Sequence, residues 1–222
     1  MAEKLLNAEL EEQIKGVFQG ITEPVVALFF GSKVSNCDYC KDTLQMLQEL
    51  AALSDKIEVQ VFDLEDNSAT AEKYHVTMAP GIVMARQNGS EPVDYGVRFA
   101  GIPAGHEFTS LVRSFLLVSN TDSGLKPATK KFLSGLKKPV KLEVFVTPTC
   151  PYCPQAVILG HQMAVESKLV ESTMVEATEF PELSNRYGVG GVPHTVINFD
   201  AASMVGAAPE SMLIGKIQEA LN

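Results

Sequence analysis

The sequence predicts an α/β protein made of two tandem units, each with a mixed β-sheet and helices on both faces. Its only four cysteines form two Cys-x-x-Cys pairs, Cys37–Cys40 and Cys150–Cys153, which lie 113 positions apart. Pro80 and Pro193 are separated by the same 113 positions, as expected for an internal duplication. In each half, apolar runs of strand length alternate with segments of helical periodicity. Helical crossovers imply parallel strands, and a hairpin adds antiparallel ones.

The first half begins with an amphipathic segment that ends at Gly20 and then an apolar run typical of a strand buried on both faces. Leucines at helical spacing follow Cys37, residues 57–62 alternate as in a strand, and the Asn88-Gly89 dipeptide is a hairpin turn signal. The expected elements are a helix over 3–20, a strand over 24–30, a helix from 37 to about 54, a strand over 57–62, a short helix over 67–75, strands over 82–86 and 93–99, and a helix from about 105 to 118.

Residues 119–127 are polar, rich in turn formers and without periodicity, which is typical of a linker. We therefore divide the chain into domains of residues 1–121 and 122–222. After the linker the same order of elements returns. We expect a helix over 128–136, a strand over 140–146, a helix from 151 to about 168, a strand near 173–177, a short helix over 180–187, strands over 195–199 and 202–205, and a helix from 209.

Charge and composition exclude several functional classes. The net charge of −9 and the pI near 5.0 argue against nucleic acid and anionic lipid as partners, because both need clustered Lys and Arg. The N-terminal residues do not resemble a secretory signal, and no apolar run approaches the ~20 residues that span a bilayer. We expect a cytoplasmic protein without a membrane partner, where a Cys-x-x-Cys pair is more often redox-active or metal-binding than a permanent cross-link.

The second cysteine pair suits thiol chemistry at a helix start. With Cys150 at the N-cap, Pro151 occupies the first helical position, and the free N–H groups stabilise a thiolate at Cys150. We expect Cys150 to attack the substrate disulfide and Cys153, one turn inward, to resolve the mixed disulfide. Cys37 and Cys40 are assigned the same two roles.

The residues between the cysteines predict which pair has the more stable thiolate. Asp38 places a negative charge next to Cys37, whereas Pro151 carries none. A neighbouring negative charge disfavours a thiolate. We therefore expect Cys150 to be the main exchange thiol and the first pair to be the more reducing one.

Two structural interpretations of the cysteines remain open. They could be buried apolar residues, or each pair could supply half of a zinc site. Each pair, however, opens a long apolar helix in a separate half of the chain. Redox chemistry is therefore favoured, and no metal is expected.

Strand, Cys-x-x-Cys at a helix start and a proline 43 residues after the first cysteine resemble the thioredoxin and glutaredoxin fold. The sequence Cys150-Pro-Tyr-Cys153 is the one found in glutaredoxins. Two such units in tandem, together with the segments 96–108, 150–157 and 191–193, resemble the protein disulfide oxidoreductases of thermophilic archaea and bacteria. The resemblance covers nearly the whole chain. It implies two tandem thioredoxin-like folds and an enzyme that reduces, oxidises or isomerises protein disulfides.

The same resemblance assigns residues and partners. Pro80 and Pro193 should be cis prolines that face the cysteine pairs, with the backbone of Ala79 and Val192 binding an extended substrate by strand addition. The substrate-binding set is completed by Tyr39 and Tyr152, which are expected to flank the thiols as apolar cover. No cofactor is expected beyond the redox-active disulfides Cys37–Cys40 and Cys150–Cys153. The expected partners are protein disulfides and a thioredoxin-reductase-like flavoprotein that donates electrons.

The sequence departs from these families in two places. Thioredoxins carry a buried acid in the strand before the motif, but residues 25–30 contain none, and the second half offers only Glu143. The proton acceptor for the resolving cysteines is therefore unassigned. The glutathione-binding residues of glutaredoxins are replaced after Pro193 by Val205-Gly-Ala-Ala, so glutathione is expected to be a poor partner.

A domain with a different function also resembles this duplicated chain. The N-terminal domain of the alkyl hydroperoxide reductase flavoprotein relays electrons to a peroxidase, but it has only one working cysteine pair. The two intact pairs of this chain favour the protein disulfide oxidoreductases. A non-catalytic peptide- or zinc-binding module is the other alternative.

Overall fold

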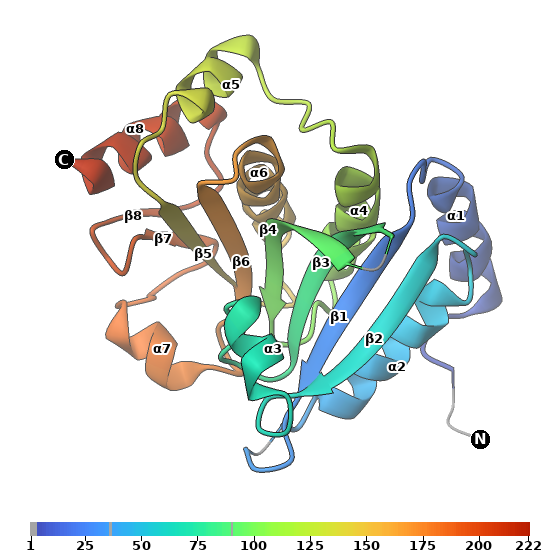
Figure 1. Cartoon of the computed structure of the whole chain (residues 1–222). Helices are drawn as coiled ribbons and strands as arrows, with labels where there is room; N and C mark the ends of the chain where they lie inside the picture. The colour runs from blue at the N-terminus through green and yellow to red at the C-terminus, as the bar shows by residue number, and fades with distance from the viewer. Residues whose placement is uncertain (1–3, 36, 90) are drawn as a thin grey trace.

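The computed structural model describes residues 4–35, 37–89 and 91–222. Within them the chain forms one eight-stranded mixed sheet with the strand order β2-β1-β3-β4-β6-β5-β7-β8 (Figure 1). The predicted α/β class and the tandem arrangement are confirmed. Residue 3, the expected start of the first helix, lies outside the described residues.

Each half contains four helices and four strands among the described residues, in the predicted order. The first half consists of α1 (Ala8–Phe18), β1 (Val25–Gly31), α2 (Cys40–Ala51), β2 (Ile57–Asp63), α3 (Ser68–Lys73), β3 (Gly81–Asn88), β4 (Glu91–Ala100) and α4 (Glu107–Asn120). The second half consists of α5 (Pro127–Ser134), β5 (Val140–Val146), α6 (Cys153–Glu166), β6 (Val170–Glu176), α7 (Pro181–Arg186), β7 (His194–Ile197), β8 (Ala202–Val205) and α8 (Glu210–Leu221).

The pairing of the strands repeats between the halves. Strand β1 lies between parallel β2 and antiparallel β3, and β5 lies between parallel β6 and antiparallel β7. Strand β4 pairs antiparallel with β3, and β8 pairs antiparallel with β7. All of β1 except Gly31 is buried, as the apolar run predicts. The main difference in bounds is α1, which begins after Asn7 because the Asn7 side chain accepts a hydrogen bond from the N–H of Leu10 at 2.9 Å.

A direct junction of β4 with β6 joins the halves into one sheet, which the sequence does not predict. The two strands are parallel and pair over four residues, from Val97 opposite Ser172 to Ala100 opposite Val175. Just before this ladder, Gly96 has φ +77°, and a Cβ there would lie 2.6 Å from the carbonyl oxygen of Val170. The backbones of the two halves therefore approach more closely than any other residue type would allow.

The helices cover the two faces of the sheet unequally. One continuous core includes apolar residues of both halves, from Ile14 of α1 to Ile217 of α8, and also includes Cys150 and Cys153. The opposite face carries only two short helices among the described residues, α3 over the first half and α7 over the second (Figure 1). The domain boundary after residue 121 lies between α4 and α5 and stays a prediction. No helix of the described chain is long and apolar enough to cross a bilayer.

Candidate active site

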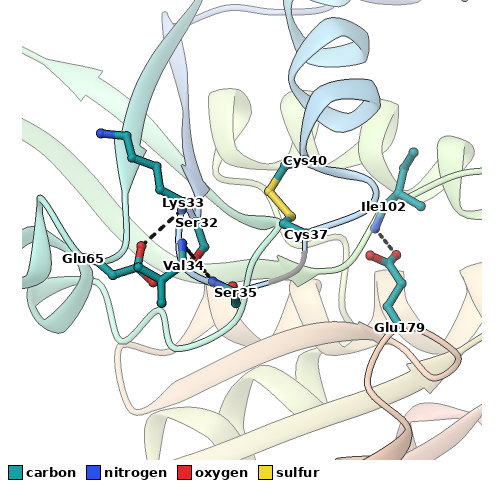
Figure 2. Close-up of a disulfide and its surroundings, with 9 residues drawn as sticks. All are labelled: Ser32, Lys33, Val34, Ser35, Cys37, Cys40, Glu65, Ile102 and Glu179. Carbon is teal, nitrogen blue, oxygen red and sulfur yellow. Dashed lines mark hydrogen bonds between the residues drawn. A yellow bond between two sulfur atoms is a disulfide. The ribbon is translucent and has the colours of Figure 1, made fainter.

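The first cysteine pair lies where β1 passes into α2. Cys37 and Cys40 form a disulfide with their Cα atoms 5.4 Å apart (Figure 2). Cys40 is the first residue of α2 and Tyr39 is its N-cap, so Cys37 precedes the helix. Both cysteines are half-buried, and the predicted pairing of these residues is present in the structure.

The second pair has the same geometry but lies deeper. Cys150 and Cys153 form a disulfide with a Cα–Cα distance of 5.5 Å. Cys150 keeps 7% of its surface exposed and Cys153 keeps none. Solvent therefore reaches a small part of Cys150 and none of Cys153; the roles of attacking and resolving cysteine stay predictions.

The predicted position of Cys150 at the helix cap is wrong by two residues. Tyr152 is the N-cap of α6, Cys153 is the first helical residue, and Pro154 rather than Pro151 lies in the first turn. Residues 150–152 form a turn before the helix instead. The disulfide nevertheless holds the sulfur of Cys150 against that of the first helical residue, so Cys150 remains at the positive end of the helix dipole.

Both prolines predicted to be cis are cis in the structure, in the bonds Ala79–Pro80 and Val192–Pro193. Their carbonyl oxygens accept hydrogen bonds from the equivalent residues Gly101 (2.8 Å) and Gly206 (2.7 Å), which confirms the internal repeat. Pro80 and Pro193 are buried, whereas the residues before them are half-buried. Ala79 lines the same cavity as Cys37, and Val192 packs against the core that contains Cys150 and Cys153.

The two predicted tyrosines are the N-cap residues of α2 and α6. Tyr39 is 45% exposed and Tyr152 is 69% exposed. Tyr39 lines the cavity beside the first disulfide together with Cys37. The role of the two rings as apolar cover of the thiols stays a prediction.

A cavity of about 640 Å³ opens beside the first disulfide and is built from both halves of the chain. Cys37, Asp38 and Tyr39 line one side and Ala79 another. Residues 178–181, which follow β6 in the second half, complete the wall. The sequence does not predict this contribution, because nothing in the pattern of residues indicates which loop of one half meets the site of the other.

A buried acidic side chain that the sequence does not reveal lies at the start of α4. Glu107 begins α4 and is 1% exposed, and neither of its carboxylate oxygens has a hydrogen-bond partner among the described residues. Burial raises the pKa of Glu107 to about 7, against a smaller opposite effect of the nearby Ser110 hydroxyl. The preceding residue, His106, donates its N–H to the carbonyl oxygen of Pro148 at 2.9 Å, so the start of α4 lies against the turn that leads into Cys150.

The substitution Glu107→Gln is expected to stabilise the protein in alkaline but not in acidic solution. An unfolded glutamate ionises near 4.5, whereas folded Glu107 ionises near 7. The native state therefore loses stability as pH rises from 4.5 to 7, by about 3 kcal/mol in total at pH 8, and a neutral amide avoids this loss. Urea unfolding of both proteins at pH 4.5 and pH 8 measures the difference. The exposed-acid variant Glu219→Gln serves as the control, and an equal effect of Glu107→Gln at both pH values would contradict the assignment.

The described residues contain no cluster of three or more His, Cys, Asp or Glu side chains placed to bind one metal ion. The four cysteines instead form the two disulfides. Each half thus contains a disulfide at a helix start and one cis proline.

Comparisons with known proteins agree with this geometry. A family model described as a thioredoxin domain matches residues 140–219. A protein disulfide oxidoreductase from Aeropyrum pernix K1 is 30% identical and has a TM-score of 0.85, with 98% of this chain and 94% of that chain covered. The N-terminal domain of the alkyl hydroperoxide reductase AhpF from Enterococcus faecalis is 27% identical, with a TM-score of 0.86 and coverage of 96% and 99%.

The curated relatives are much longer proteins. The alkyl hydroperoxide reductase AhpF of Pseudomonas aeruginosa is 27% identical over 194 residues, which are 87% of this chain and 34% of that protein. The chain thus spans about a third of the length of the curated relatives it matches.

The fold and the two disulfides define the thioredoxin-like class of redox proteins. Similarity to the Aeropyrum pernix protein extends over the whole duplication, both units included. The chain belongs to the tandem thioredoxin-fold family of protein disulfide oxidoreductases.

Proposed function

We propose that the protein catalyses thiol–disulfide exchange on protein disulfides through two Cys-x-x-Cys sites. The observation that carries this proposal is the graded exposure of the second pair, in which Cys150 is reachable and Cys153 is fully buried. A structural disulfide has no need of one accessible sulfur. An exchange enzyme does, because its attacking thiolate must reach the substrate while the resolving thiol stays protected.

The exchange at the second site runs in two steps. The Cys150 thiolate attacks one sulfur of the substrate disulfide and releases the other as a thiolate. Cys153 then attacks the Cys150 sulfur of the mixed disulfide and releases the second substrate sulfur, so the protein is oxidised and the substrate reduced by two electrons. The reverse sequence oxidises a substrate dithiol. Cys37 and Cys40 have the same roles at the first site.

Glu107 is our candidate for the proton acceptor of Cys153. A resolving cysteine with no exposed surface must lose its proton to a group inside the protein. Glu107 is buried beside the turn that contains Cys150, and its pKa of about 7 suits proton exchange with a thiol near neutral pH. The one acid of β5, Glu143, instead pairs with Lys141 at 3.2 Å and lines a cavity with residues of α7.

The residues before the cis prolines are proposed to bind the substrate backbone. Ala79 and Val192 are half-buried beside the first and second sites, where an extended peptide could pair with their main chain. The exposed rings of Tyr39 and Tyr152 would contact its side chains. Binding through the backbone is insensitive to sequence and would let one enzyme serve many protein substrates.

The proposed electron donor is a thioredoxin-reductase-like flavoprotein, and the proposed compartment is the cytoplasm, where reduced thiols are maintained. Similarity to the alkyl hydroperoxide reductase AhpF supports a second candidate function, in which the protein passes electrons to a peroxidase. Two intact cysteine pairs favour the first candidate.

The test is the reduction of insulin by dithiothreitol with and without the protein. Catalysed reduction, together with capture of substrate proteins as mixed disulfides by the Cys153→Ser variant, supports the proposal. Stoichiometric zinc in the purified protein without any acceleration would show that the cysteines are structural.

A further inference from the structure

Glu179 belongs to the second half of the chain but lies in the wall of the first-site cavity. It follows β6 in the segment 178–181 and shares that cavity with Cys37 and Asp38. Figure 2 shows its side chain reaching from the second-half loop to the N–H of Ile102, on one side of the Cys37–Cys40 disulfide. Asp38 lines the same cavity, and its negative charge contributes to a raised pKa of Glu179.

The first half holds this carboxylate in place. The N–H of Ile102 donates a hydrogen bond to Glu179 Oε1 at 2.6 Å (Figure 2). Gly101 has φ +89°, and a Cβ at that position would lie 2.7 Å from the same oxygen. The N–H of Gly101 in turn donates to the carbonyl oxygen of Pro80. One short segment of the first half therefore contacts both the cis proline of the site and the carboxylate that arrives from the second half.

The surroundings keep Glu179 protonated more readily than an ordinary glutamate. Burial raises its pKa to about 7, and the negative charges of Glu176 and Asp38 act in the same direction, against the hydrogen bond from Ile102. The titratable and charged groups around it are Asp38, Tyr39 and Cys37 in the first-site cavity, Glu176 on β6, and, in the cavity next to it, Lys141, Glu143, Glu182, Arg186 and Tyr187.

We propose that Glu179 is the acid–base residue of the Cys37–Cys40 pair, so that the second half supplies the proton acceptor for the disulfide of the first half. This inference rests on the proposed exchange activity and assigns a residue that the first half does not itself provide. The arrangement is reciprocal, because Glu107 of the first half lies against the turn of the second site. Each cysteine pair thus uses a carboxyl group from the opposite half.

Glu179 donates one proton and accepts one proton in each turnover. The Cys37 thiolate attacks the substrate disulfide, and the first released substrate thiolate takes its proton from the Glu179 carboxyl group. The resulting carboxylate accepts the proton of Cys40. The Cys40 thiolate then attacks the Cys37 sulfur, re-forms the disulfide and releases the second substrate thiolate, which is protonated by solvent. Two electrons pass from the dithiol to the substrate, and Glu179 ends in its starting form.

The kinetic test uses full-length protein with one active pair. In the Cys150→Ser/Cys153→Ser background, the exchange rate with a synthetic peptide disulfide is measured from pH 5 to pH 9. Glu179→Gln is expected to lower this rate at least tenfold near pH 7 and to remove the inflection near that pH, and Glu179→Asp should restore part of both. Glu182→Gln, on the neighbouring helix α7, should leave the profile unchanged. In the complementary background Cys37→Ser/Cys40→Ser, Glu179→Gln should have no effect.

A second measurement does not depend on turnover. Carbon NMR of the Glu179 carboxyl group should give a higher titration midpoint in the reduced protein than in the oxidised protein, because a Cys37 thiolate disfavours a nearby carboxylate. An unchanged midpoint, an unchanged pH profile in Glu179→Gln, or an equal loss of rate in both backgrounds would overturn the assignment. If the protein with only the first pair has no exchange activity at all while its carboxyl midpoint still follows the redox state, the proposed function fails at this site but the contact between Glu179 and the cysteines stands.

Discussion

Replacing both Cys37 and Cys150 by serine is expected to lower catalysed insulin reduction about a thousandfold or more, to the rate of dithiothreitol alone. A serine hydroxyl is not ionised near neutral pH and cannot form a mixed disulfide, so neither site could begin a turnover. Cys150→Ser alone should remove more than half of the activity and Cys37→Ser less than half, because Cys150 is expected to be the main exchange thiol.

The control for this series is Thr149→Ser, which alters the exposed residue before Cys150 and keeps all four thiols. It should retain the activity of the parent protein. Wild-type rates in both single serine variants and in the double variant would show that the cysteines take no part in the reaction.

Gly96→Ala is expected to destabilise the protein by about 2–4 kcal/mol, one of the largest effects of a single methyl group in this chain. The added Cβ would lie 2.6 Å from the carbonyl oxygen of Val170 and 3.1 Å from Cα of Glu171, which are backbone atoms of the opposite half. The strands β4 and β6 would have to separate to accept it. The midpoint of urea unfolding measures the loss.

Gly89→Ala isolates the cause of that loss. Gly89 has φ +64°, similar to that of Gly96, but no described atom lies within 4 Å of its Cβ position. Gly89→Ala should therefore lower the free energy of unfolding only by the cost of placing an alanine in the left-handed backbone region, about 1 kcal/mol. Equal losses in the two variants would show that backbone strain, and not the contact between the halves, accounts for the effect.

The elements of the fold could be predicted because each depends on local patterns. The apolar run of β1, the alternation of β2 and the leucines of α2 are visible within a few residues of sequence, and the repeat verified each one in the other half. The pairing of β4 with β6 could not be predicted, because it depends on how two complete units meet. The one local feature related to this pairing is Gly96, but a glycine in a strand can also mark a bulge or a bend, so it does not predict the pairing.

The site was predictable to the same extent. The cysteines and cis prolines belong to motifs within one unit, and the structure contains both disulfides and both cis bonds as predicted. The proposed acids Glu107 and Glu179 come from the opposite halves, and the burial that raises the pKa of each depends on how the assembled chain packs, which no local pattern shows. The assignment of the first pair as the more reducing one stays a prediction.

The duplicated strand occupies two different environments. In the first half, β2 is an outer edge of the sheet, and its residues are mostly half-buried or exposed. Its counterpart β6 lies in the interior, where six of its seven residues are buried. Two separate units would each present two unpaired strand edges, which are templates for aggregation. Among the described residues the fused chain presents only β2 and the four-residue β8 as edges, so the junction of β4 with β6 removes half of the edges at which the protein could assemble wrongly.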